Sequence, residues 1–407
     1  MKKILLITQG HTPNIGDYAI ARCEEEFFKS QGFEVVRAPY EIQISEKLRL
    51  TGKLAILTNK IFSKCYFLND IWHKKRIKSL LANADCNPED FSCAIIGGGE
   101  LVGSHKGFNS SFYNWCKVLS DKRIPIAVHG VSGDINMNAR LLERYKVSLR
   151  KCFRVSVRDR KTVANFKKAY DFVPFYSPDA VFAFPKLSAF ADRSEGKSGN
   201  LSDINGTCGT DSADGTAGNE SRAKNVLCIP VPYAQDMEKT LGTRNEQAYF
   251  DYLINAACKN STDGNSNRSQ PFEIRLNITS TVAGDMDFVQ RFADYAQNTA
   301  KNKARNNAQN IPKLTAKVIP FAQFDEFLTL LESSDLIISA RMHACILALL
   351  KNRKICAVPF REKLKTFKEE YTDSQNTENL RKIIDESYAG LCALADEIQT
   401  ENIRTKE

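Results

Sequence analysis

The sequence lacks several features that would assign it to a familiar functional class. None of its 12 cysteines forms a Cys-x-x-Cys pair, and none clusters with histidine at the spacing of zinc ligands. No run approaches the ~20 consecutive apolar residues of a membrane-spanning helix. No basic stripe with interleaved aromatic residues indicates nucleic acid binding. We therefore expect a cytoplasmic protein with reduced, buried thiols, no bound metal and no nucleic acid partner.

The net charge indicates which partners suit the protein, and the amino-terminal segment indicates how the fold begins. The formal net charge of +9 suits anionic small substrates or an anionic membrane surface. The apolar run that ends at Thr8 is too short for a signal peptide, so it is predicted to be the first β-strand. The basic residues 73–76 suit peripheral contact with the inner face of a membrane, and a solvated helix face is the alternative.

The order of the predicted elements indicates an α/β protein with parallel sheets. Strands at 4–8 and 33–37 flank a helix over 18–31, which is the βαβ order that opens a parallel sheet. Further strands are predicted in this half at 93–96, 124–129 and 154–159, and glycine-rich runs follow the first two of them.

From residue 225 the alternation becomes regular and predicts a second Rossmann-like sheet. Residues 186–224 are rich in Gly, Ser, Asp, Asn and Thr and carry few large apolar groups, so we expect a flexible polar linker. The predicted domains are 1–185, 186–224 (the linker), 225–375, and 376–407, a helix and tail that can pack back on the first domain. The second sheet is predicted to have strands at 225–231, 272–279, 316–320, 335–339 and 354–359, with helices at 246–258, 285–297, 323–333, 343–351 and 361–370.

Polar residues after predicted strands are the first candidates for a site, because ligands of open parallel sheets bind beyond the carboxyl ends of the strands. Asn14, Gly16 and Asp17 precede the first helix, whose N-terminus favours an anion, and Asp17 can instead bind a sugar hydroxyl. A turn glycine with an N-cap aspartate explains the same residues without any ligand.

A run of three glycines includes Gly98 and Gly99 and is followed by Glu100. Consecutive glycines are costly in conformational entropy, so another group is expected to approach this backbone closely. The spacing matches neither the dinucleotide fingerprint nor the phosphate-binding loop of ATPases, so neither NAD nor ATP is expected. The approaching group is either a ligand or a tightly packed helix.

Arg158 lies at the carboxyl end of another predicted strand, where a guanidinium can bind a phosphate or carboxylate with two hydrogen bonds. Asp159 is expected either to hold Arg158 or to cap the next helix, and an internal Arg–Asp pair is the alternative to ligand binding. His129 is expected to line the site, whereas His73 and His105 are expected at the surface.

Arg341 and His343 form the strongest candidate, between a predicted strand and an apolar helix. The N–H groups of a helix start favour an anion, and Arg341 adds a planar cationic donor. A lone histidine usually has a structural role, but here an arginine, a histidine and a helix start converge within three residues. A helix N-terminus disfavours a charged imidazole, and a bound phosphate dianion would restore its proton.

These motifs, in this order, resemble those of the polysaccharide pyruvyl transferase family. The resemblance implies two Rossmann-like domains that face each other across a cleft, as in GT-B glycosyltransferases. It implies that Arg158 and Arg341 bind phosphoenolpyruvate, that His343 is the general acid, and that the main-chain N–H of Met342 is a further donor. The matching elements are Asn14-x-Gly16-Asp17, Gly97-Gly98-Gly99-x-Leu101, Ser156-Val157-Arg158-Asp159, Pro178-Asp179 and Ser339-x-Arg341-x-His343-Ala344, with Lys363 downstream.

The resemblance further implies transfer of pyruvate from phosphoenolpyruvate to hydroxyls of a sugar or a lipid-linked oligosaccharide, with ketal formation and no cofactor. The donor would bind between Arg158 and the helix start at Arg341, and His343 would protonate its methylene carbon. Two other interpretations stay open: a GT-B glycosyltransferase that uses a nucleotide-sugar, and a catalytically silent family member. A glycosyltransferase would need a carboxylate for ribose and a base-stacking pocket, and neither is evident in the second half.

Overall fold

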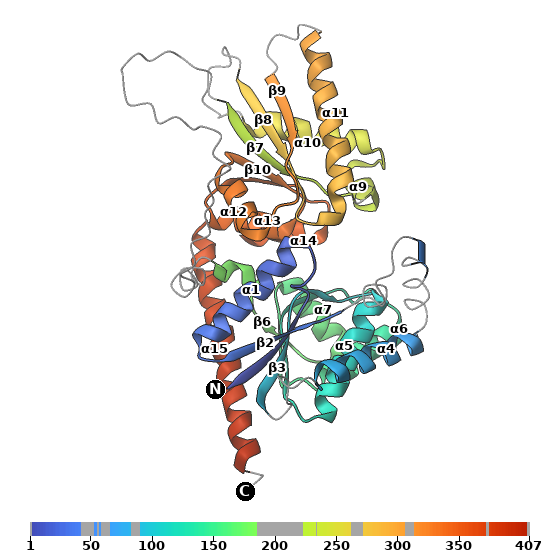
Figure 1. The fold of residues 1–407 in the computed structure, drawn as a ribbon, viewed down its shortest axis with the longest axis vertical. Helices are drawn as coiled ribbons and strands as arrows, with labels where there is room; N and C mark the ends of the chain where they lie inside the picture. The colour runs from blue at the N-terminus through green and yellow to red at the C-terminus, as the bar shows by residue number, and fades with distance from the viewer. Residues whose placement is uncertain are drawn as a thin grey trace, which may run out of the picture. The chain divides into compact units, whose positions relative to one another are not determined.

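The protein is represented by a computed structural model that divides into two compact units. Unit 1 contains Met1–Phe184 and Thr366–Glu407, and unit 2 contains Pro185–Lys365. Each unit is built on one parallel β-sheet (Figure 1). Most of the predicted linker lies outside the described residues, which are 2–41, 53–54, 57, 66–82, 90–184, 223–232, 234–261, 272–305, 313–371 and 374–404.

Unit 1 contains a six-stranded parallel sheet in the order β2-β1-β3-β4-β5-β6. Its inner strands are apolar on both faces, as a parallel sheet covered on both sides requires. The strands are β1 (Lys3–Thr8), β2 (Glu34–Pro39), β3 (Phe91–Val102), β4 (Ile126–Gly133), β5 (Arg154–Val157) and β6 (Phe175–Tyr176), and the helices are α1 (Ile15–Ser30), α4 (Tyr66–Leu80), α5 (Lys106–Asp121), α6 (Ala139–Leu149), α7 (Arg160–Tyr170), η2 (Ala180–Ala183) and α15 (Ser374–Arg404).

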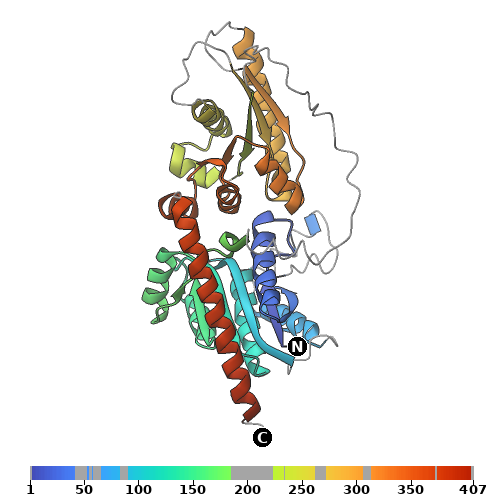
Figure 2. The same ribbon diagram turned by 90° about the vertical axis from the view of Figure 1, so that its left-hand side faces the viewer.

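The two faces of this sheet pack against different helices. On one face, Leu5 of β1 belongs to the apolar cluster that includes Trp115 of α5 and Tyr145 of α6. On the other face, α1 and α15 both contact β3. Phe27 of α1 stacks on Tyr388 of α15, with ring centroids 4.3 Å apart. Helix α15 follows unit 2 in the chain and returns to complete the core of unit 1 (Figure 2).

The glycine-rich runs lie inside strands, which corrects the prediction that they follow strands. Both β3 and β4 continue through their glycines. A Cβ atom on Gly97 would collide with the carboxylate of Glu24, and one on Gly98 would collide with the side chain of Ile20. Gly98 also has a left-handed φ of 63°. Helix α1 therefore packs directly on the β3 backbone, because glycine leaves the space and permits the conformation.

Unit 2 contains a five-stranded parallel sheet in the order β11-β10-β7-β8-β9. All five predicted strands and all five predicted helices of this half are found, although α11 runs eight residues past its predicted end, and the short helix α9 is an element that the periodicity missed. The strands are β7 (Lys224–Ile229), β8 (Glu273–Ile278), β9 (Lys313–Val318), β10 (Leu336–Ser339) and β11 (Lys354–Ala357), and the helices are α9 (Ala234–Leu241), α10 (Glu246–Ser261), η3 (Ala283–Asp285), α11 (Met286–Arg305), α12 (Phe324–Glu332), α13 (Met342–Leu350) and α14 (Glu362–Tyr371).

The structure confirms the predicted fold class of two Rossmann-like α/β sheets. The change from unit 2 to unit 1 falls within α14, at Thr366. Tyr371, at the end of this helix, belongs to unit 1, where its hydroxyl donates to the carbonyl of Arg158 at 3.2 Å. Within the described part of the chain, no helix is both long and apolar enough to cross a membrane.

Candidate functional site

Arg158 directly follows β5 and is held inside unit 1. Its Nη1 donates to Oδ2 of Asp179 at 2.8 Å, and its Nη2 donates to the hydroxyl of Ser132 at 2.8 Å. The side chains of Arg158 and Asp179 are only 4% and 3% exposed. The buried charge of Arg158 is therefore balanced within the unit, by an internal Arg–Asp pair whose acid is Asp179 rather than Asp159.

Asp159 caps helix α7, which is one of the two roles expected for it. Its carboxylate accepts hydrogen bonds from the main-chain N–H of Thr162 at 2.7 Å and from the hydroxyl of Thr162 at 2.9 Å. These bonds satisfy a donor that the helix geometry leaves unpaired. They also fix the direction in which the chain leaves β5.

The loop after β1 forms a second capped helix start. Helix α1 begins at Ile15, three residues earlier than predicted, because Asn14 is its N-cap and accepts from the N–H of Gly16 at 3.0 Å. Asn14 Nδ2 donates to Asp17 Oδ2 at 2.8 Å. The structure thus places Asn14, Gly16 and Asp17 together in one polar turn, with Asn14 rather than Asp17 as the cap.

The predicted residues of β3 and β4 fall into two groups. Gly98 lies against α1, whereas Gly99 has a left-handed φ of 88° and Glu100 is exposed near the end of β3. His129 is buried in β4, where its Nδ1 contacts Oε1 of Glu24 at 3.3 Å and its ring stacks on Tyr388. The structure therefore shows His129 as a core histidine, and its expected contact with a substrate stays a prediction.

Glu24 is the acidic partner of this buried histidine. Burial raises the pKa of the Glu24 carboxyl above its usual range, and the hydrogen bond to His129 opposes that rise. The Nε2 atom of His129 lies 3.3 Å from the hydroxyl of Ser177 and 3.5 Å from that of Ser387. This network joins α1, β4 and α15, which ties the returning helix to the sheet.

Arg341 and His343 lie where β10 passes into α13 in unit 2. Arg341 is the N-cap residue of α13, and its main-chain N–H donates to the hydroxyl of Ser339 at 3.0 Å. Met342 and His343 occupy the first turn, and His343 is half-buried. The first N–H groups of a helix have no acceptor within the helix, so this turn favours an anion.

The guanidinium of Arg341 is oriented by Asp285, which sequence reasoning missed. Arg341 Nη2 forms an ion pair with Oδ2 of Asp285 at the end of η3. The hydroxyl of Ser280 donates to the same Asp285 oxygen at 3.2 Å. The two paired side chains are 15% and 13% exposed, so this pair keeps more contact with solvent than the Arg158–Asp179 pair does. The other predicted residue of unit 2, Lys363, is half-buried in the first turn of α14.

Three partners of the candidate arginines were absent from the predicted site. Asp179 lies in the Pro178-Asp179 motif, so the sequence offered a signal for it. Ser132 and Asp285 carry no such signal, because they come close to Arg158 and Arg341 only through the fold. No group of three or more His, Cys, Asp or Glu side chains among the described residues is arranged to hold a metal ion.

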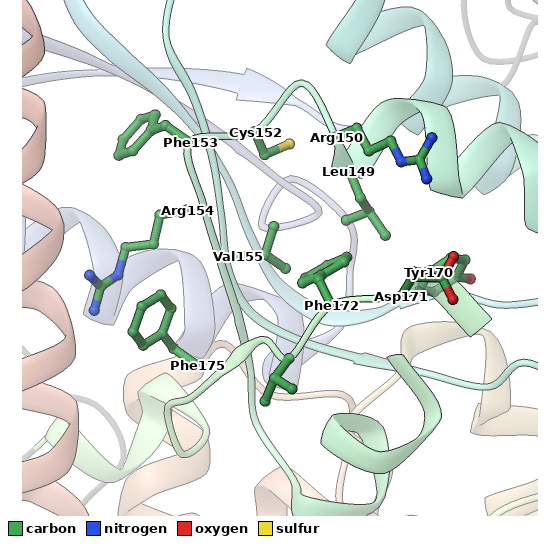
Figure 3. Close-up of a pocket in the computed structure, with 11 residues that line it drawn as sticks. Leu149, Arg150, Cys152, Phe153, Arg154, Val155, Tyr170, Asp171, Phe172 and Phe175 are labelled. Atoms are coloured by element: carbon green, nitrogen blue, oxygen red, sulfur yellow. The ribbon is translucent and has the colours of Figure 1, made fainter. Parts of the chain in front are cut away.

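A pocket of about 310 Å³ lies at the opposite edge of the unit 1 sheet, where β5 and β6 begin (Figure 3). Leu149, Val155 and Phe172 are among the side chains that line it. Arg154 lies over the ring of Phe175, 4.2 Å from its centroid. None of the predicted site residues lines this pocket, so it is separate from the carboxyl ends of the strands.

Comparisons with known proteins assign the family. The profile of the family named polysaccharide pyruvyl transferase matches residues 14–359. No curated protein sequence matches the chain. Solved structures similar to it include a putative UDP-N-acetylglucosamine 2-epimerase from Listeria monocytogenes, with 11% identity, a TM-score of 0.48 and coverage of 94% of this chain and 87% of that one.

Two further solved structures show likeness over almost the whole chain. One is the UDP-GlcNAc 2-epimerase from Neisseria meningitidis bound to UDP-GlcNAc, with 10% identity, a TM-score of 0.44 and coverage of 98% and 93%. The other is α,α-trehalose 6-phosphate synthase from Burkholderia multivorans, with 9% identity, a TM-score of 0.43 and coverage of 100% and 98%. The family profile covers most of the chain, and this protein therefore belongs to the polysaccharide pyruvyl transferase family and is a transferase.

Proposed function

We propose that this transferase moves pyruvate from phosphoenolpyruvate to hydroxyl groups of a sugar. The observation that carries the proposal is the turn at the start of α13, where Arg341 is oriented by Asp285 and His343 follows two residues later. A guanidinium, helix N–H groups and an imidazole within one turn suit a small molecule that carries a phosphate and a carboxylate. Membership of the pyruvyl transferase family supports the same donor.

In the proposed reaction, Arg341 and the N–H groups of the α13 start, including that of Met342, bind the donor anion. His343 gives a proton to the methylene carbon, and a sugar hydroxyl attacks the adjacent carbon and returns its proton to the imidazole. The bond from that carbon to the phosphate oxygen then breaks. A second hydroxyl closes the ketal, and its proton leaves with the phosphate. Donor and diol thus give a ketal and inorganic phosphate, with no oxidant or cofactor.

Within unit 1, Arg158 stays a predicted anion-binding residue. Two of its nitrogens already donate to Asp179 and Ser132, so only its remaining N–H groups are available to a ligand. Asp17 is partly exposed and stays a predicted contact of a sugar hydroxyl, and Glu100 is exposed and stays a predicted substrate-binding residue.

Incubation with phosphoenolpyruvate and a panel of nucleotide-linked and lipid-linked sugars tests this function. We expect release of inorganic phosphate together with a product whose mass corresponds to a pyruvyl ketal of one acceptor. Sugar transfer from a nucleotide-sugar without consumption of phosphoenolpyruvate would instead identify a glycosyltransferase. Absence of phosphate release with every acceptor would indicate a catalytically silent member.

A further inference from the structure

Helix α4 presents several large apolar side chains to solvent. Phe67 and Ile71 are 71% and 50% exposed, and Leu68 between them is 37% exposed. Phe67 has the highest exposed fraction of the large apolar side chains in the described part of the chain. Phe67 and Ile71 are four residues apart and therefore lie one above the other on the same face of the helix.

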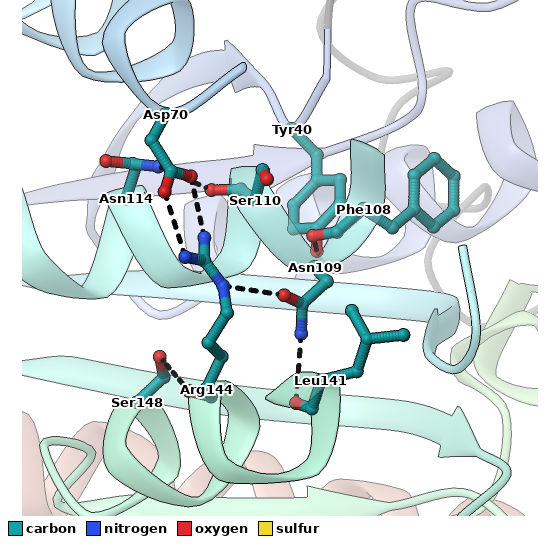
Figure 4. A network of polar contacts seen from close by, with 9 residues as sticks. All are labelled: Tyr40, Asp70, Phe108, Asn109, Ser110, Asn114, Leu141, Arg144 and Ser148. Carbon is teal, nitrogen blue, oxygen red and sulfur yellow. Dashed lines mark hydrogen bonds and ion pairs between the residues drawn. The ribbon is translucent and has the colours of Figure 1, made fainter. Parts of the chain in front are cut away.

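The inward face of α4 carries the buried Ile77 and is anchored by polar contacts (Figure 4). Asp70 forms a bidentate ion pair with Arg144 of α6, with N–O distances of 2.6 and 2.9 Å, and accepts from Asn114 of α5 at 3.0 Å. Arg76 donates to the main-chain carbonyls of Pro39 and Tyr40 at 3.1 and 3.0 Å. These bonds hold the helix in one rotation, with Phe67 and Ile71 facing outward.

Lysines continue the outward face toward the end of the helix. Lys75 and Lys78 are exposed, and they follow Ile71 at helical spacing, so the apolar first turns pass into a basic stretch on the same side. At the other end, Lys106 and Arg140 lie over the ring of Tyr66, at 5.4 and 4.4 Å from its centroid. Lysines thus border the apolar patch beyond Ile71, and two further basic side chains lie beside the first turn of α4.

We propose that the outward face of α4, defined by Phe67, Leu68, Ile71, Lys75 and Lys78, docks on an anionic membrane surface. An apolar patch that enters the interface between headgroups and acyl chains, bordered by lysines, is the pattern of helices that lie on membranes. Anionic lipid headgroups complement the lysines, whereas a second copy of this face would bring like charges together.

The docking surface is independent of the proposed chemistry, because none of its residues belongs to the turn at Arg341. Within the basic segment 73–76, different side chains lie on different faces of α4. Arg76 and the buried His73 face inward, and the lysines that reach the lipid include Lys75 and Lys78. A lipid-linked acceptor in the same membrane would then be presented to a protein that is already bound there.

Sedimentation of the full-length protein with lipid vesicles tests this proposal. We expect binding to phosphatidylcholine vesicles that contain phosphatidylglycerol and little binding to phosphatidylcholine alone. The double variant F67S/I71S should weaken binding by about tenfold or more. The double variant K75Q/K78Q should weaken it by about fivefold per lysine and reduce its dependence on salt. All four positions lie on the outward face, so thermal unfolding should match that of the unchanged protein.

A control is another exposed apolar pair of unit 1, Val173 and Phe175, which are among the residues that line the pocket of Figure 3. The variant V173S/F175S should bind vesicles as the unchanged protein does. Loss of binding in this variant and not in F67S/I71S would overturn the assignment to α4, as would equal binding to neutral vesicles or none at all. Gel filtration adds a fourth outcome: a dimer that F67S/I71S dissociates would show that a second copy covers the face.

Discussion

The two candidate arginines, Arg158 and Arg341, share a design but differ in exposure. Each follows a parallel strand, and each pairs with a carboxylate that lies elsewhere in its own unit. The Arg158–Asp179 pair is almost completely buried, whereas the side chains of Arg341 and Asp285 are about one-seventh exposed. Desolvation makes the first pair costly to break, whereas the second pair keeps more contact with solvent.

This difference in exposure indicates that the two units use their polar groups differently. In unit 1 the polar groups of β4 and of the residues after β5 make internal contacts: Arg158 binds Ser132 and Asp179, and Asp159 binds Thr162. In unit 2 the turn after β10 keeps a half-exposed histidine and a helix start beside its arginine. The polar groups of unit 1 are therefore mostly engaged within the unit, and the start of α13 is the better candidate for the catalytic site.

The largest expected effect comes from the variant His343→Ala. General acid catalysis contributes about 10²–10⁴-fold to rate, so pyruvyl transfer should fall by that factor. Thermal unfolding should remain close to that of the unchanged protein, because the side chain is only half-buried. The rate of phosphate release with a saturating acceptor measures the loss.

His105 supplies the control for that variant. It is an exposed histidine that caps α5 by accepting from the N–H of Phe108 at 3.1 Å. His105→Asn keeps a capping side chain and should leave turnover unchanged. Turnover in His343→Ala that stays near normal would remove the histidine from the mechanism and weaken the case for unit 2 as the catalytic side.

Stability distinguishes the two ion pairs directly. Asp179→Asn keeps an acceptor for the N–H of Val181 but leaves the buried charge of Arg158 without its counter-ion. The free energy of unfolding of unit 1 should fall by about 3–5 kcal/mol. Asp285→Asn should cost less, because the Arg341–Asp285 pair keeps more contact with solvent. Urea unfolding measures both values, and equal losses would contradict the contrast between the pairs.

Much of the fold could be predicted, because strand and helix periodicity is a local property of the sequence. The five strands of unit 2 and the helix start at Arg341 were correct for this reason. Prediction failed where contacts between residues distant in the sequence determine the structure. The glycines of β3 were expected after a strand, yet they lie within it, where α1 packs on Gly97 and Gly98. Asp285 could not be foreseen, since it is 56 residues from Arg341 in the chain.

The position of His73 also differs from the one predicted from the sequence. His73 gives the smallest predicted effect on stability. Its basic neighbours suggested a surface position, but His73 is buried on the inward face of α4. Burial, reinforced by Arg76, lowers the pKa of His73 to about 3. In the unfolded chain His73 has an ordinary pKa near 6.5, so below that pH the unfolded state binds a proton that the native state does not bind. Stability is complete above about pH 6.5 and declines as the pH falls toward about 3.

At about pH 5 this histidine should cost unit 1 about 2 kcal/mol relative to neutral pH. The variant His73→Leu cannot take up the proton, so its unfolding free energy should fall less between about pH 7 and pH 5 than that of the unchanged protein. Urea unfolding of both proteins at each pH gives the two slopes. Parallel slopes would mean that the native state protonates His73 readily. That result would contradict the buried, uncharged state of His73 in unit 1.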